Sequence, residues 1–185
     1  GVFDVAVPAF ATQEGVQHRV AWIFAAFGAA TVVGGLLGGL VSKKLAPLLA
    51  LRRAYLLWLI ACVPVAFTYP DWSMALVGAC IGFLGGAVQV FYFEVLEAVR
   101  PKGSQTASLG WIWSVEGSFM ALGAAVGGVV SESFSPRFGL AMLPTMIFIG
   151  LIILSIGRAR LSAANDVPTE EEDLQAMKDI SDESK

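Results

Sequence analysis

The sequence predicts an all-α fold, a polytopic bundle of membrane-spanning helices, and three observations lead to this prediction. Hydrophobic residues make up 56% of the 185 positions and charged residues only 15%, compared with about 25% charged residues in an average soluble domain. The mean hydropathy is +0.71. The apolar residues also form runs of the length that crosses a hydrocarbon core, which takes roughly 20 helical residues. A water-soluble domain of this size could not bury so much apolar surface.

Loops that are charged or contain Pro or Gly divide the chain into six apolar segments. The first, residues 1–11, is a partial span that ends before a turn at Glu14 and Gly15. Five complete spans follow, approximately at residues 20–41, 54–69, 73–96, 109–130 and 138–157. The span at 54–69 is short, but apolar residues precede it, and Arg52 and Arg53 can extend their charged ends to the interface. We therefore expect five complete helices and one partial helix.

The basic residues of the short loops predict the orientation in the membrane. Eight of them lie in the loops at 42–53 and 99–108 or directly after the last span: Lys43, Lys44, Arg52, Arg53, Arg100, Lys102, Arg158 and Arg160. The opposite side has two, Arg19 and Arg137. Because Lys and Arg are enriched in cytoplasmic loops, this distribution places the first group and the C-terminal tail in the cytoplasm.

This orientation also bears on the first segment. Residues 1–11 would rise toward the outer face, and a helix of that length would start near the middle of the membrane. A free amino terminus and unpaired backbone donors at that depth would be costly. We therefore expect the sequence to be a fragment whose upstream part is missing.

Two regions of the chain differ in charge. Residues 1–160 form the predicted transmembrane bundle and carry ten basic and seven acidic residues. Residues 161–185 contain eight of the fifteen acidic residues, with an acidic run at 170–173. That composition is typical of a solvated, disordered tail, and a short surface helix around 170–180 is the alternative.

Small residues recur at helical spacing within the spans. Gly78, Gly82 and Gly86 follow one another at intervals of four and share one face of a helix, and similar clusters occur at 34–39 and 123–128. Such faces let two helix backbones approach closely in lipid. We expect these glycines to form helix–helix contacts.

Three polar residues inside the spans are candidate functional residues, because polar and ionisable groups are costly at that depth. Asp4 and Glu116 lie about 15 Å and about 10 Å from the ends of their helices. Either carboxyl group could take up and release a proton as its surroundings open to one side and then the other. The alternative is a structural carboxylate, hydrogen-bonded to a neighbouring helix. Gln89 is a candidate for substrate contact.

Two further carboxylates, Glu94 and Glu97, close the span at 73–96. Arg100 and Lys102 follow within a few residues. We expect this end of the helix to be solvated and ion-paired rather than functional.

The composition argues against other classes of site. The chain has one histidine and two cysteines, Cys62 and Cys80, which both lie in apolar runs, where a thiol usually packs as a small hydrophobic group. No metal site and no cofactor are therefore predicted. No dinucleotide fingerprint, Walker A loop or nucleophile elbow is present. We expect neither an enzyme nor a nucleic-acid-binding protein.

Several segments resemble a known family. Residues 1–11, the following turn and the glycine-rich run at 27–39 resemble the seventh and eighth helices of bacterial major facilitator superfamily carriers. Residues 99–111 and 123–128 resemble the connection between the tenth and eleventh helices and the glycine-rich eleventh helix. The resemblance covers nearly all of residues 1–160 and implies the C-terminal half of such a carrier, from the middle of helix seven through helix twelve. The loop at 39–44 lacks the acidic residue common in the family, so the gating role of that residue is not carried over.

The resemblance implies a secondary active transporter that moves a small solute by alternating access, with the substrate path near the midplane between two halves. Asp4 and Gln89 would lie on helices that line this path, and Glu116 on a supporting helix. Proton-coupled efflux through Asp4 or Glu116 is the more specific hypothesis. The expected partners are the lipid bilayer of the cell membrane, a small-molecule substrate and the missing N-terminal half. A non-transporting membrane scaffold or accessory subunit is the alternative.

Overall fold

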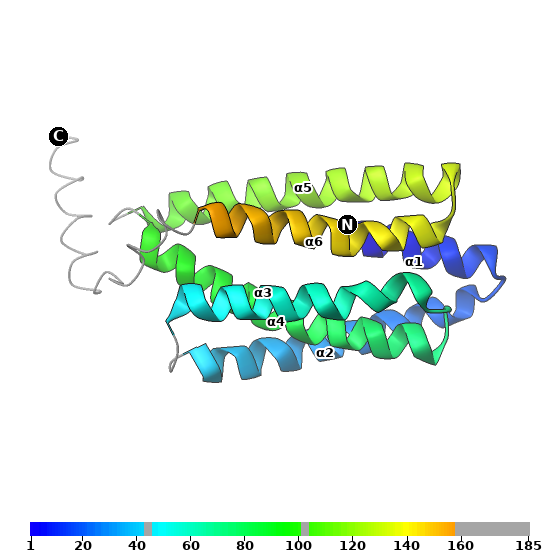
Figure 1. Cartoon of the computed structure of the whole chain (residues 1–185), viewed down its shortest axis with the longest axis horizontal. Coiled ribbons are helices and arrows are strands. Elements are labelled where there is room, and N and C mark those ends of the chain that lie inside the picture. Colours follow the sequence, from blue (N-terminus) through cyan, green and yellow to red (C-terminus); the bar gives the residue numbers. More distant parts are fainter. Residues whose placement is uncertain (43–45, 101–103, 158–185) are drawn as a thin grey trace, which may run out of the picture.

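The chain folds as a bundle of long helices (Figure 1). The computed structural model describes residues 1–42, 46–100 and 104–157, so the predicted acidic tail lies outside the described residues. Within these ranges the elements are α1 (Val2–Gln13), η1 (Gln17–Arg19), α2 (Val20–Ser42), α3 (Pro47–Cys62), η2 (Val63–Phe67), α4 (Trp72–Val99), α5 (Gln105–Ser133) and α6 (Pro136–Ile156), where η marks a short 3-10 helix. Five segments of the described chain are long and apolar enough to cross a membrane. The predicted all-α membrane bundle is confirmed.

One span differs from its predicted bounds more than the others do. The helix α3 begins at Pro47, seven residues before the predicted start, because proline fits the first turn of a helix, where its missing N–H is not needed. It ends at Cys62 and continues as the 3-10 helix η2, which contains Pro64. A proline ring clashes with the preceding turn of an α-helix, so the α-helical bonding stops there. The tighter 3-10 turn then completes the span.

The helices form two groups of three, α1 to α3 and α4 to α6, and several of their contacts match between the groups. The helix α2 packs on α4 as α5 packs on α1, and α3 packs on α4 as α6 packs on α1, while α3 and α6 contact each other. These contacts are therefore the same when α1 is exchanged with α4, α2 with α5 and α3 with α6. Since α1 and α4 run in opposite directions (Figure 1), the two groups form an inverted repeat.

The closest contact in the bundle joins α2 to α4. Glycines on both helices place one backbone directly against the other. At Gly34, an added Cβ atom would lie 1.8 Å from the carbonyl oxygen of Phe83. At Gly82 and Gly86, it would lie 2.3 Å and 2.1 Å from the carbonyl oxygens of Phe27 and Thr31. No real side-chain atom fits at such distances. The predicted helix–helix contact is confirmed for Gly82 and Gly86, whereas Gly78 lies at ordinary contact distance from the Phe3 ring.

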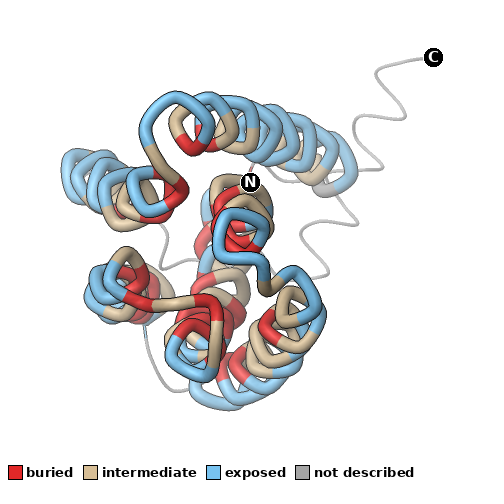
Figure 2. The backbone as a smooth tube through the Cα atoms, turned by 90° about the vertical axis from the view of Figure 1, so that its right-hand side faces the viewer, coloured by how far each residue is buried: buried red, intermediate tan, exposed pale blue. Residues whose placement is uncertain are grey.

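The hydrophobic core is centred on the short helix α1. Its buried residues are Phe3, Ala6, Val7, Phe10 and Ala11, and they pack with buried side chains from the other helices, including Ile23, Cys62, Met74, Ile81 and Leu140. Figure 2 shows the buried residues turned toward the middle of the bundle. The outward faces of α2 and α5 carry large exposed apolar side chains, such as Leu36 and Phe119. These faces are suited to lipid or to another apolar surface.

Aromatic contacts fix the end of α1 to the neighbouring elements. We call this end of the bundle, with the turns at 14–19, 68–71 and 134–135, the Glu14 end; the opposite end is the Pro47 end. The rings of Phe10 and Tyr69 meet edge to face, with centroids 6.0 Å apart, and the Arg137 guanidinium lies 5.0 Å from the Phe10 ring centre. The Glu14 carboxylate accepts a hydrogen bond from the Tyr69 phenol and raises the pKa of that phenol.

The glycine contact gives a first prediction. Gly86→Ala should lower the free energy of unfolding by about 1–3 kcal/mol, because the added methyl group must push two backbones apart. Gly28→Ala, on the outer part of the same helix pair, is the matched control, since a Cβ atom there would meet nothing within 4 Å. That variant should be neutral or slightly more stable. Thermal unfolding in detergent, followed by circular dichroism, compares the two. Equal losses in both variants would contradict the argument.

The phenol contact gives a second prediction. Glu14→Gln should bring the pKa of Tyr69 back toward its ordinary value of 10.0, because the hydrogen bond to Glu14 is the largest cause of the rise. The bond favours the protonated phenol, so its stabilising contribution is present below pH 10 and is lost as the pH rises through the higher native pKa. Tyrosinate absorbance can be titrated in a background with Tyr55 and Tyr92 changed to Phe. Glu132→Gln, an exposed glutamate at the same end, should leave the titration unchanged.

Candidate functional site

A cavity of about 650 Å³ opens beside the start of α1. It lies between α1, α3, α5 and α6, and α2 and α4 each contribute one residue to its wall. The described lining residues are Gly1, Val2, Phe3, Asp4, Phe27, Tyr55, Trp58, Ile81, Phe119, Met120, Leu122, Gly123, Val126, Met142, Leu143, Met146, Ile147, Ile149, Gly150 and Ile153. Its volume lies within the range of known small-molecule sites.

The wall of this cavity is mainly apolar and aromatic. Trp58 is held in place because its indole N–H donates a hydrogen bond to the Ile81 carbonyl oxygen at 2.9 Å. Tyr55, one turn earlier on α3, meets the Trp58 ring edge to face at 5.6 Å. Both rings are half-buried. The cavity therefore has a fixed aromatic wall on the α3 side.

Asp4 is the one carboxylate among the described lining residues. Its side chain is exposed, and one carboxylate oxygen lies 2.8 Å from the Gly1 amino nitrogen. Phe3, the residue before it, is buried in the core. Since consecutive residues of a helix point about 100° apart, burial of Phe3 turns Asp4 away from the core and toward the cavity.

The structure does not bring the other two predicted residues into this cavity. Gln89 is half-buried on α4, and Glu116 is exposed on α5. Glu116 lies close enough to Tyr92 for an electrostatic interaction, and Gln89 shares the α4 face of Tyr92 at a spacing of three residues. In the same region the rings of Phe93 and Trp113 contact each other at 6.2 Å. No hydrogen bond or ion pair found in the described chain joins Asp4, Gln89 and Glu116 to one another.

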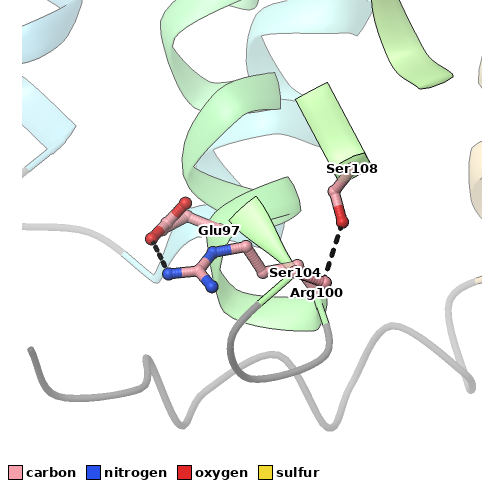
Figure 3. Close-up of polar contacts among 4 residues, drawn as sticks. All are labelled: Glu97, Arg100, Ser104 and Ser108. Carbon is pink, nitrogen blue, oxygen red and sulfur yellow. Dashed lines mark hydrogen bonds and ion pairs between the residues drawn. The ribbon is translucent and has the colours of Figure 1, made fainter. Parts of the chain in front are cut away.

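The two carboxylates at the end of α4 differ from each other. Glu97 forms an ion pair with Arg100, as predicted (Figure 3). Glu94 is half-buried instead, and one of its carboxylate oxygens is buried with no hydrogen-bond partner in the part of the chain that the structure describes. Such a group is costly and marks a candidate site. Glu94 follows Ala87 by two helical turns, on the face that contacts Gly38 of α2.

Sequence reasoning also missed the aromatic and methionine residues of the cavity wall. Tyr55, Trp58, Met120 and Met146 belong to three helices, and nothing in their local sequence shows that they converge. The one available signal was the spacing of Tyr55 and Trp58, which puts both on one face of α3. Among the described residues no group of three His, Cys, Asp or Glu could hold a metal ion.

The comparisons with known proteins bear on the whole chain. The family model described as Major Facilitator Superfamily matches residues 1–182. No curated protein and no solved structure matches the chain. The family is one of membrane transporters, and its match spans every described helix, the cavity and all three predicted residues. The chain therefore belongs to the major facilitator superfamily, as an integral multi-pass membrane protein.

Proposed function

We propose that this chain is the C-terminal half of a secondary active transporter that exports a small solute by alternating access. The observation that carries the proposal is the cavity of about 650 Å³ with an apolar, aromatic wall and the carboxylate of Asp4. Such a wall favours a solute with a large apolar surface, and the carboxylate favours a positive charge on it. The inverted repeat of the bundle supports rocking about a central site.

The proposal couples export to proton movement through Asp4 or Glu116. A carboxyl group binds a proton more readily when its surroundings lose water, and releases it when they become wet again. Asp4 lines the cavity directly, so closure of the cavity around it changes its access to water. Glu116 lies outside the described cavity wall. In the proposal it would bind and release the proton at its own position on α5, away from the solute.

The rest of the proposal concerns the surroundings of the bundle. An N-terminal half of the same polypeptide would complete the substrate path and contact the exposed apolar faces of α2 and α5, which include Leu36, Leu40 and Phe119. Lipid of the cell membrane would cover the remaining apolar faces. In this proposal the Pro47 end faces the cytoplasm, and the basic residues of the loops support that orientation.

The role of the carboxylates can be tested in vesicles that contain the full polypeptide. Asp4→Asn should lower pH-gradient-driven uptake of a lipophilic cationic dye, ethidium, by roughly tenfold, while dye exchange without a gradient continues. Glu116→Gln should have a smaller effect, since Glu116 does not line the cavity. Glu132→Gln is the control at an exposed site. Unchanged coupling in both Asp4→Asn and Glu116→Gln would remove the proposed proton pathway.

The cavity itself can be tested by filling it. Met146→Trp adds an indole ring to the wall and should abolish dye transport, because the added volume occupies the space of the solute. Met146→Leu nearly conserves volume and should transport normally. Ile60→Trp, on the exposed face of α3 and outside the described cavity wall, controls for the effect of an added ring. Full transport by Met146→Trp, with native thermal stability, would place the solute elsewhere.

A further inference from the structure

A second pocket, of about 520 Å³, lies at the Glu14 end and has no part in the proposed transport mechanism. It is lined by His18 and Arg19 of η1, Trp22 of α2, and Asp71 and Trp72 at the start of α4. The lining thus combines two nitrogen bases, one carboxylate and two indole rings. This mixture differs from the mainly apolar wall of the first cavity.

The pocket lies at the depth of a membrane interface. Two of the segments that are long and apolar enough to cross a membrane begin at Gln17 and at Trp72. The pocket is therefore located where hydrocarbon gives way to headgroups. The rings of Trp22 and Trp72 lie 4.8 Å apart, and Trp72 is 80% exposed. Tryptophan prefers this depth, because its ring is apolar and its N–H is polar.

The basic side chains in the pocket retain donors that a ligand can use. The Arg19 guanidinium donates one long hydrogen bond, 3.4 Å, to the Pro70 carbonyl oxygen. Across the described residues it lies within ion-pair distance of no carboxylate, so most of its five N–H donors are open to a ligand. His18 is exposed. A guanidinium with open donors binds phosphate in a bidentate manner.

The negative group is held in place by the helix that it caps. Asp71 is the N-cap residue of α4, and its carboxylate accepts a hydrogen bond of 2.7 Å from the Ser73 amide. Hydrogen bonds from Ser73, and secondarily the charge of Arg19, hold the pKa of Asp71 below its usual value. The carboxylate is therefore charged at neutral pH. A purely anionic ligand in this pocket would be repelled by it.

An apolar path leads from the pocket into the membrane. Leu76, Cys80 and Phe83 are exposed on α4. They follow Trp72 at spacings of four, eight and eleven residues, which places all four side chains on one face of the helix. An acyl chain lying along this face would have its headgroup at the pocket. This continuity favours a lipid over a water-soluble phosphate compound.

We propose that this pocket binds the headgroup of a zwitterionic phospholipid that carries a primary ammonium group. Arg19 and His18 bind the phosphate. Asp71 accepts hydrogen bonds from the ammonium group, which also lies on the face of the Trp72 ring. One acyl chain follows the exposed face of α4. The site holds a lipid of one leaflet against the starts of α2 and α4, whichever solute the transporter moves.

Native mass spectrometry of the full chain in detergent tests the proposal, with phosphatidylethanolamine and phosphatidylglycerol of identical acyl chains as probes. The native chain should retain phosphatidylethanolamine about fivefold more tightly. Asp71→Asn removes the charge but keeps a good helix cap, so it should lose this discrimination. Arg19→Gln should weaken both lipids by about fivefold. Arg53→Gln, an exposed arginine at the Pro47 end, should behave as the native chain.

Three results would overturn the proposal. Equal retention of the two lipids by the native chain would mean that Arg19 and Asp71 only neutralise each other. Unchanged discrimination between the two lipids in a folded Asp71→Asn variant would exclude the contact between Asp71 and the ammonium group. If Asp71→Asn does not fold, Asp71→Ser, which also caps a helix, is tested in its place. Displacement of the lipid by an equal concentration of glycerophosphoethanolamine would show a site for a soluble compound. Circular dichroism of every variant separates lost binding from lost structure.

Discussion

The backbone contact between α2 and α4 is the constraint on which the rest of the bundle depends. In lipid there is little hydrophobic force between helices, so association relies on close packing of small residues. Gly34, Gly82 and Gly86 bring the two backbones to a separation at which no side chain fits between them. The equivalent pair in the other half of the repeat, α1 and α5, also brings two backbones together, because a Cβ atom at Gly1 would lie 2.3 Å from the Met120 carbonyl oxygen. Further along the same pair, a Cβ atom at Gly127 would lie 3.2 Å from the Val2 Cα atom.

The cavity lies beside the first residues of α1. The side chains of Ala6 and Val7 are completely buried, so this helix is held in the core by its middle and its end. Its first residues contact α5 through Val2 and open toward α3 and α6. Methionines of α5 and α6 line the opening, and such flexible side chains adapt to varied ligand shapes. Asp4 lies between the buried core residue Phe3 and the cavity.

The fold was largely predictable from the sequence, but the site was predictable only in part. Length and hydropathy determine where a membrane helix lies, and they located the described spans well, with the largest error at the start of α3, where Pro47 permits an earlier first turn. The direction of a side chain is harder to predict, because α2 and α5 are apolar around most of their circumference and show little periodicity. Asp4, singled out by its depth, lines the cavity, and its functional role stays a prediction. Depth alone could not show that Gln89 and Glu116 lie elsewhere, or that Glu94 has a buried oxygen without a partner.

The position of Glu116 has a consequence for what covers α5. A carboxylate at the middle of a bilayer costs about 2.5–3.5 kcal/mol or more when lipid surrounds it. The nearby serines do not offset this cost, because Ser114 and Ser118 donate their hydroxyl hydrogens to carbonyl oxygens of α5 itself. The face of Glu116 carries the exposed apolar side chains of Trp113, Phe119 and Met120 at spacings of three and four residues. A carboxylate exposed at this depth is better matched by water or by another protein surface than by acyl chains. The proposed transport path supplies both, with water when it is open and the second half of the carrier when it is closed.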